Sequence, residues 1–260
     1  MPLSFADAQF ITALSAGIDK SKLETFASRL KQWQKKGFPP GTQVGKGARA
    51  EYGAAQILQL ALMAKLLKVG LTPERAQHVI ETGWSAFRDG FIETMLCQAN
   101  DADHLHYFLI QLNALTDLTN PGSDHDHIFV EILTDEEMSE AWAPAEEIDS
   151  DEDLKRYEYF RFVVKNRMAL SITVEIDSLL IWIWSAMKVK GHSPEIFAEE
   201  FAAWEKERRE NGRDKQVDEH EINNDLFRRS IADQLESAPD RIEYARAALK
   251  FIAQPKSIDR

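Results

Sequence analysis

The segment from Lys20 to Lys36 has the pattern that most narrowly limits what this chain can fold into. Its apolar side chains recur at three- and four-residue steps, the period of one face of an α-helix. These side chains are Leu23, Phe26, Ala27, Leu30 and Trp33. The basic side chains lie largely off that face; they are Lys22, Arg29, Lys31 and Lys36. The pattern predicts an amphipathic helix with one buried side and one basic side in solvent.

A stretch rich in glycine and proline follows this helix. Gly37 can supply a left-handed cap, and the Pro-Pro-Gly sequence at 39–41 prevents the helix from continuing. From there to Tyr52 the glycines keep the chain extended or turning. The stretch therefore predicts a wing-like loop or hairpin that carries Lys46 and Arg49.

Helices are also expected on both sides of these two segments. Ser4 and Asp7 are placed to cap a first helix that Gly17 ends. The segment Ala54–Lys68 is apolar around most of its circumference, so we expect it to form the buried centre of the N-terminal part. A further helix should begin at Pro73, because proline is favoured in the first helical turn.

Charge divides the chain unevenly, although the overall formal charge is −12. Residues 1–92 hold 12 basic and 7 acidic side chains, whereas residues 93–260 hold 19 and 36. Between Lys20 and Arg49 there are eight basic residues and one acid. Such asymmetry indicates two modules with different partners, divided near residue 92. Charge alone leaves open whether the basic side binds phosphate or is only a solvated helix face.

Three stretches within residues 5–82 carry a more specific signal: RLKQWQKKGFPP, GARAEY and LALMAKLLKVGLTPERA. They resemble the N-terminal winged helix-turn-helix domain of the MerR family of transcription regulators. In that family an arginine and a tyrosine of the wing touch the DNA backbone, and the resemblance places them at Arg49 and Tyr52. The chain departs from the family pattern by a longer stretch before Trp33 and by Gln32 in place of an aromatic residue.

The resemblance implies a regulator that binds double-stranded DNA. A helix in the major groove reads base edges, while basic residues neutralise phosphates and set the register. The candidate groove-facing positions are Lys20, Lys22 and residues 24–29, which include Arg29. The candidate phosphate contacts are Lys31, Lys35, Lys46, Arg49 and Tyr52.

The expected partners follow from this function. We expect a homodimer, because two half-sites multiply the affinity of a small domain for DNA. RNA polymerase or another regulator is a further candidate partner. No long heptad run follows Trp84, so the dimer surface cannot be read from the sequence.

Residues 93–260 predict an acidic α+β module that senses a ligand, contacts a protein or pairs two copies. Alternating β-branched and aromatic residues indicate strands at 107–112, 128–133, 157–164 and 169–176. Helices are expected after a cap at Asp177, then at 197–209, 224–235 and 240–253. Thr134–Asp153 holds ten acids and no base, which is typical of a solvated loop. The fold class is thus mainly α with an α+β C-terminal part.

Other function classes find little support in the sequence. Two pairs of histidines, at 104 and 106 and at 125 and 127, have a spacing that could chelate a metal from a strand, but they adjoin expected turns. Cys97 is the single cysteine, and the chain has no glycine-rich phosphate loop and no nucleophile elbow. We therefore expect no metal, no cofactor and no enzymatic activity.

The chain is also expected to be cytoplasmic and free of membrane. No stretch reaches the roughly 18 uninterrupted apolar residues of a membrane span, and the N-terminus lacks the features of a secretion signal.

The alternative function is a protein-interaction module of the kind found in phages or mobile elements, in which the winged helix binds protein instead of DNA.

Overall fold

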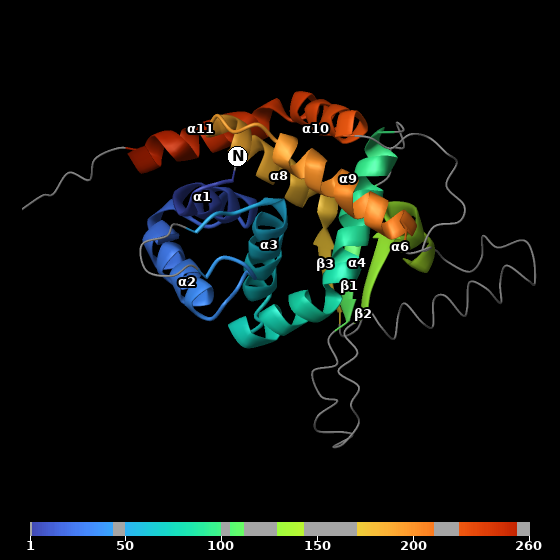
Figure 1. The fold of residues 1–260 in the computed structure, drawn as a ribbon, viewed down its shortest axis with the longest axis horizontal. Coiled ribbons are helices and arrows are strands. Elements are labelled where there is room, and N and C mark those ends of the chain that lie inside the picture. The colour runs from blue at the N-terminus through green and yellow to red at the C-terminus, as the bar shows by residue number, and fades with distance from the viewer. Residues whose placement is uncertain are drawn as a thin grey trace, which may run out of the picture. The chain divides into compact units, whose positions relative to one another are not determined.

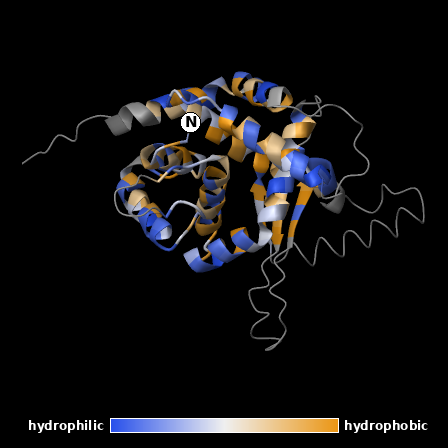
Figure 2. Ribbon diagram, viewed as in Figure 1, coloured by the Kyte–Doolittle hydropathy of each residue, from blue (hydrophilic) through white to orange (hydrophobic). Residues whose placement is uncertain are grey.

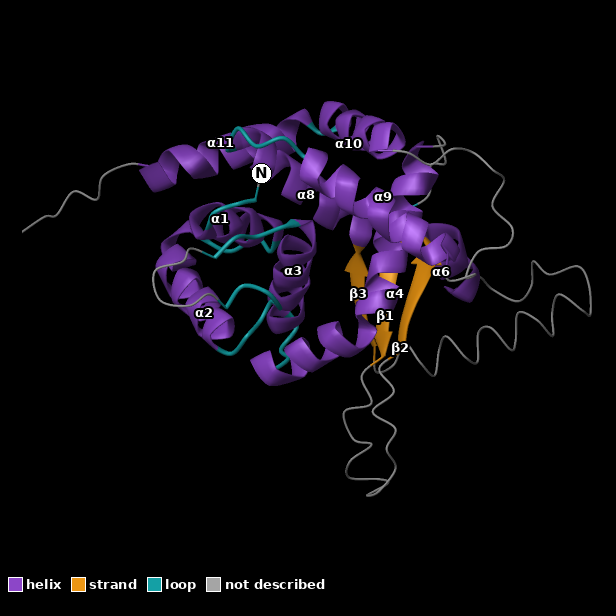
Figure 3. Ribbon diagram, viewed as in Figure 1, coloured by secondary structure: helices purple, strands orange, loops and turns teal. Residues whose placement is uncertain are grey.

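A computed structural model describes residues 2–43, 50–99, 105–111, 129–142, 171–210 and 224–253. These residues form two compact units (Figure 1). The first unit joins Met1–Gln77 with Ser178–Arg260, and the second is His78–Asp177. The fold is mostly helical with one small antiparallel sheet, as the sequence predicts (Figure 3).

The N-terminal helices begin and end at the expected signals. Helix α1 (Phe5–Ser15) starts with a capping box between Ser4 and Asp7 and ends before Gly17, whose φ is 63°. Glycine adopts this left-handed conformation without the steric cost that a Cβ would add. Helix α3 (Ala54–Lys68) has the expected bounds and packs against α1. Its buried residues lie on most of its circumference, so α3 is the centre of this part of the core.

The helix expected from Lys20 to Lys36 is divided. A short 3₁₀ turn, η1 (Lys20–Lys22), precedes the α-helix α2 (Leu23–Lys35). The turn is held by Asp19, whose Oδ1 accepts hydrogen bonds from the Ser21 backbone N–H at 2.8 Å and from the Ser21 hydroxyl at 2.6 Å. This local side-chain bonding competes with regular helix at its first turn, which explains the later start of α2.

Four helices from the C-terminal part complete the first unit: α8 (Ile176–Val189), α9 (Glu195–Glu210), α10 (Asn224–Ser237) and α11 (Pro239–Ala253). Their core is aromatic: the Trp184 ring lies 4.6 Å from that of Phe197, and Phe201 lies 5.9 Å from Phe227. The indole N–H of Trp184 donates to Gln234 at 2.6 Å, so its one polar atom is satisfied inside this core.

These C-terminal helices also contact the N-terminal ones. Helix α9 packs against α3, and α11 lies against η1. Within α8, the side chains of Leu180, Ile183 and Trp184 are fully buried. Trp182 is only partly buried, and its ring lies 5.5 Å from that of Tyr244.

The second unit is a three-stranded antiparallel sheet packed on helix α4 (Pro73–Ala99). The strands are β1 (His106–Gln111), β2 (Phe129–Thr134) and β3 (Ser171–Glu175), in the order β2-β1-β3. They confirm three of the expected strands, with ends shifted by one or two residues. The fourth, expected at 157–164, lies outside the described residues.

Two glycines let α4 approach this sheet closely. A Cβ at Gly83 would lie 2.8 Å from Val130 Cγ2, and one at Gly90 would overlap the ring of Phe108. Phe87 and Phe91 flank the Phe108 ring edge-on, with centroids 4.9 and 5.1 Å away. The spacing of seven residues between the glycines places both on one helix face, so the backbone itself packs on the sheet.

Two expectations about the C-terminal part need correction. The acidic run was expected to be a loop, but its first residues form helix α6 (Asp135–Trp142), whose three acids in the first turn suit a helix N-terminus. Asp177 lies inside the first turn of α8 instead of capping it. The sheet and the C-terminal helices lie in different compact units. The boundary expected near residue 92 falls within α4, and the functional division into 1–92 and 93–260 stays a prediction.

Candidate nucleic-acid interface

Helix α2 has one buried side and one charged side. Phe26, Leu30 and Trp33 are at most 5% exposed, and the rings of Phe26 and Trp33 pack edge-on with centroids 6.1 Å apart. The expectation that Trp33 is a core residue is therefore confirmed. Figure 2 colours much of α2 as hydrophilic, in keeping with its many polar and charged residues.

Four of the sequence-predicted DNA contacts lie exposed on α2 or at its start; they are Lys22, Arg29, Lys31 and Lys35. In the part of the chain that the structure describes, no acidic side chain pairs with Lys22, Arg29 or Lys35. The Lys31 ammonium lies 5.7 Å from the centroid of the Phe5 ring, within the range of a cation–π contact. An exposed cation that is not paired with an acidic side chain is available to bind a phosphate.

Lys36 differs from these residues, because it is paired. Its Nζ lies 2.6 Å from Oε1 of Glu74 in the first turn of α4. This hydrogen bond and charge lower the pKa of Glu74. Both side chains are more than half exposed, so the pair adds little stability.

The loop after α2 is fixed to the end of the helix by side-chain amides. Gln34 Nε2 donates to the carbonyl of Thr42 at 2.9 Å, and Gln43 Nε2 donates to the carbonyl of Lys35 at 3.0 Å. Phe38 is fully buried beneath this loop. The start of the expected wing is therefore well positioned relative to the basic side of α2.

Within the described residues, the predicted DNA contacts in the wing are not seen as exposed side chains, in contrast to those on α2. Lys46 and Arg49 lie outside the described residues. Tyr52 is 2% exposed and exchanges two backbone hydrogen bonds with Leu3, at 2.9 and 3.0 Å. Burial raises the pKa of Tyr52. The Tyr52 ring is therefore largely packed inside the protein, and the expected contact of Tyr52 with the DNA backbone stays a prediction.

Lys20 lies in η1, and nothing is described of its side chain. The exposed polar positions that sequence reasoning did not single out include Gln32, on the same side of α2 as Ser28 and Lys35. Their spacing of three and four residues is the signal that could have identified this row. In such a row, polar side chains can form hydrogen bonds with the edge of a base pair, and basic side chains can bind the neighbouring phosphates.

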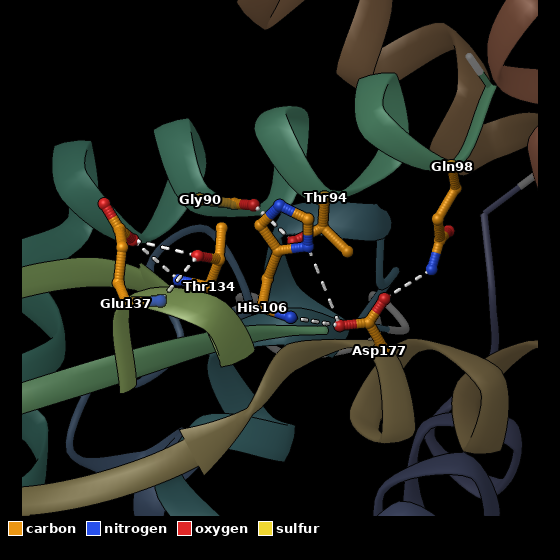
Figure 4. Close-up of polar contacts among 7 residues, drawn as sticks. All are labelled: Gly90, Thr94, Gln98, His106, Thr134, Glu137 and Asp177. Atoms are coloured by element: carbon orange, nitrogen blue, oxygen red, sulfur yellow. Dashed lines mark hydrogen bonds and ion pairs between the residues drawn. The ribbon is translucent and has the colours of Figure 1, made fainter. Parts of the chain in front are cut away.

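A second polar cluster lies in the other unit, around Asp177 (Figure 4). The Asp177 carboxylate accepts the backbone N–H of His106 at 2.7 Å and the side-chain amide of Gln98. The His106 ring nitrogen Nδ1 lies 3.9 Å from the same carboxylate. Burial raises the pKa of Asp177, and the hydrogen bond from His106 partly opposes this.

This cluster joins the start of β1, the end of α4 and the start of α8, so it has a clear structural role. No group of three or more potential metal ligands occurs among the residues that the structure describes. His104, His125 and His127 of the expected chelating pairs lie outside those residues. His106, which is described, is 2% exposed.

Comparison with known protein families agrees with the geometry of the N-terminal part. Residues 20–82 match the MerR HTH family regulatory protein model, a minority of the 260 residues. No curated protein and no solved structure gives a significant match. Within the described ranges, no helix combines the length and the apolar character needed to cross a membrane. The matched residues contain η1, α2, α3 and the start of α4, so this part of the chain is similar to the helix-turn-helix domain of MerR-family regulators.

Proposed function

We propose that the chain is a transcription regulator that binds a duplex site with α2 in the major groove. The observation that carries this proposal is the set of exposed cations on α2 that have no acidic partner among the described residues, opposite a fully packed side. Rigid packing of one side fixes the orientation of the other, which a groove-reading helix requires.

The residues divide by role in this proposal. Lys22 and Arg29 face the groove edge together with Lys20, while Lys31 and Lys35 neutralise phosphates. Lys46 and Arg49 of the wing add phosphate contacts, as the family resemblance implies. A homodimer on two half-sites, control by residues 93–260 and contact with RNA polymerase or another regulator are further parts of the proposal, as is a cytoplasmic location.

Fluorescence anisotropy of the full chain with labelled duplex fragments tests this function. Binding should weaken with salt, with a log–log slope of roughly −0.9 for each neutralised phosphate. The double variant Lys31→Gln/Lys35→Gln should lower the magnitude of that slope by about two units. The matched control is Lys206→Gln, which removes an exposed lysine from α9 and should leave binding unchanged.

Two results would contradict the proposal. One is no duplex binding at low salt by the folded full chain. The other is binding that the double variant leaves unchanged, which would place the DNA on another surface. Capture of a protein by a contact that salt does not weaken would instead favour the protein-interaction alternative.

A further inference from the structure

A hollow of about 300 Å³ lies between α2, the end of α3 and the turn after α1. This volume is at the lower end of the range for small-molecule sites, about 300–1,000 Å³. The apolar part of its wall includes Phe26, Trp33, Ala64 and Leu67. An aromatic and aliphatic wall of this kind can contact the apolar part of a ligand.

The charged side chains in the wall of this hollow are mostly cationic. They include Lys22, Arg29 and Lys68, against one acid, Asp19. The Asp19 carboxylate is already engaged by the backbone and hydroxyl of Ser21. The hollow therefore presents an excess of positive charge beside an apolar surface.

The position of Lys68 is set by the turn after α1. Its Nζ donates to the carbonyl of Ala16 at 3.4 Å, which leaves two of its three ammonium hydrogens for another acceptor. Lys22 and Arg29 make no ion pair with any residue that the structure describes. All three cations are thus able to bind an anion that enters the hollow.

We infer that this hollow binds a small organic anion with an aromatic or aliphatic body. The body fills the apolar part beside Phe26 and Trp33, and its carboxylate or sulfonate lies among Lys22, Arg29 and Lys68. Small-molecule sites commonly combine an apolar wall with a few convergent polar groups, which fix the orientation of the ligand and provide specificity. The assignment rests on charge complementarity and on the volume of the hollow.

The inference also predicts regulation, and this part rests on the proposed function. Lys22 and Arg29 belong to the proposed DNA-contacting set, so a bound anion would engage side chains that the duplex also needs. DNA affinity should then fall severalfold when the ligand is bound. The ligand and the duplex would weaken each other by the same factor, as linkage requires.

The probe for this site is anilinonaphthalene sulfonate, whose fluorescence rises when its aromatic body leaves water. Titration of the full chain should show one saturable site. Lys22→Gln and Lys68→Gln should each weaken it severalfold, whereas Lys65→Gln, on the same helix but not in the hollow, should not. The uncharged analogue phenylnaphthylamine, with the same body and no sulfonate, should bind severalfold more weakly.

Three results overturn the inference: no saturable binding, binding that neither Lys22→Gln nor Lys68→Gln changes, or equal binding of the uncharged analogue. Circular dichroism of each variant excludes loss of fold as the cause of a change.

Competition with labelled duplex separates this inference from the proposed function. If the duplex binds and the dye does not, the hollow is not a ligand site and the DNA function stands. If the dye binds as described and no duplex binds, the site stands and the proposed function fails. If both bind without competition, the regulatory part is overturned.

Discussion

The side chain of Asp7 links the start of α1 to the turn after α8. Its carboxylate accepts the Ser4 hydroxyl at 2.6 Å within the capping box of α1. It also lies 3.2 Å from Lys190 Nζ and 3.2 Å from His192 Nε2, both in the turn after α8. Burial by itself would raise the pKa of Asp7, but hydrogen bonds from Ser4, His192 and Lys190 outweigh it and lower the pKa to about 2.

The lowered pKa predicts a pH-dependent contribution to stability. The folded pKa is below the ordinary 3.8, so the contribution is present above pH 3.8 and is lost as the pH falls through about 2. Asp7→Asn should lower the free energy of unfolding at pH 7 by about 1–2 kcal/mol, allowing for partial solvent screening. Urea unfolding at pH 7 and near pH 2 measures this difference, which should shrink at the lower pH.

The control for this prediction is Asp233→Asn, on an exposed position of α10, which should change stability by less than about 0.5 kcal/mol. An Asp7→Asn variant as stable as the wild type at pH 7 would show that the contacts with Lys190 and His192 contribute nothing.

At the scale of elements, the close approach of α4 to the sheet depends on glycine. A methyl group at Gly90 would overlap Phe108 and lie 3.0 Å from Ile132 Cγ1. Phe108 cannot easily move, because Phe87 and Phe91 pack against its ring from α4. Packing thus outweighs the weak helix propensity of glycine at this position.

Gly90→Ala should therefore destabilise the chain. Overpacking costs about 1–3 kcal/mol, and the better helix propensity of alanine returns at most about 1 kcal/mol. The expected net loss is about 1–2 kcal/mol by urea unfolding. Ser85→Ala, at an exposed position of the same helix, is the control and should stay within about 0.5 kcal/mol of the wild type. A more stable Gly90→Ala variant would contradict the close packing.

At the scale of the whole molecule, the helix-turn-helix region does not fold around its own residues alone. Helix α9 covers part of α3, α11 lies against η1, and Asp7 pairs with the turn after α8. These contacts come from residues more than a hundred positions further along the chain, yet they belong to the same compact unit.

A fragment of residues 1–99 should consequently be less stable than the full chain. It keeps α1, α2, α3 and α4 but loses α9 and the partners of Asp7. For a fragment of this size, each lost kcal/mol lowers Tm by about 4–8 °C, so we expect a Tm at least about 10 °C lower or no cooperative transition. Thermal melts followed by circular dichroism measure this, and equal Tm values would show that the N-terminal part is autonomous.

The sequence by itself determined the local structure of the N-terminal part. The capping box at Ser4, the glycines after α1, α2 and α3 and the apolar period of α2 all depend on near neighbours in the chain, so their patterns are visible in the sequence. The basic, exposed side of α2 could be predicted for the same reason, since burial of its apolar face leaves the other face in solvent.

Only the tertiary structure decided which of these residues meet distant parts of the chain. Tyr52 matched a family position for a DNA contact, but its pairing with Leu3 buries it. The hollow beside Lys22, Arg29 and Lys68 and the grouping of α8–α11 with the N-terminal helices also depend on contacts between remote segments. Such contacts are set by how packed surfaces fit together, and neither periodicity nor charge along the chain encodes that fit.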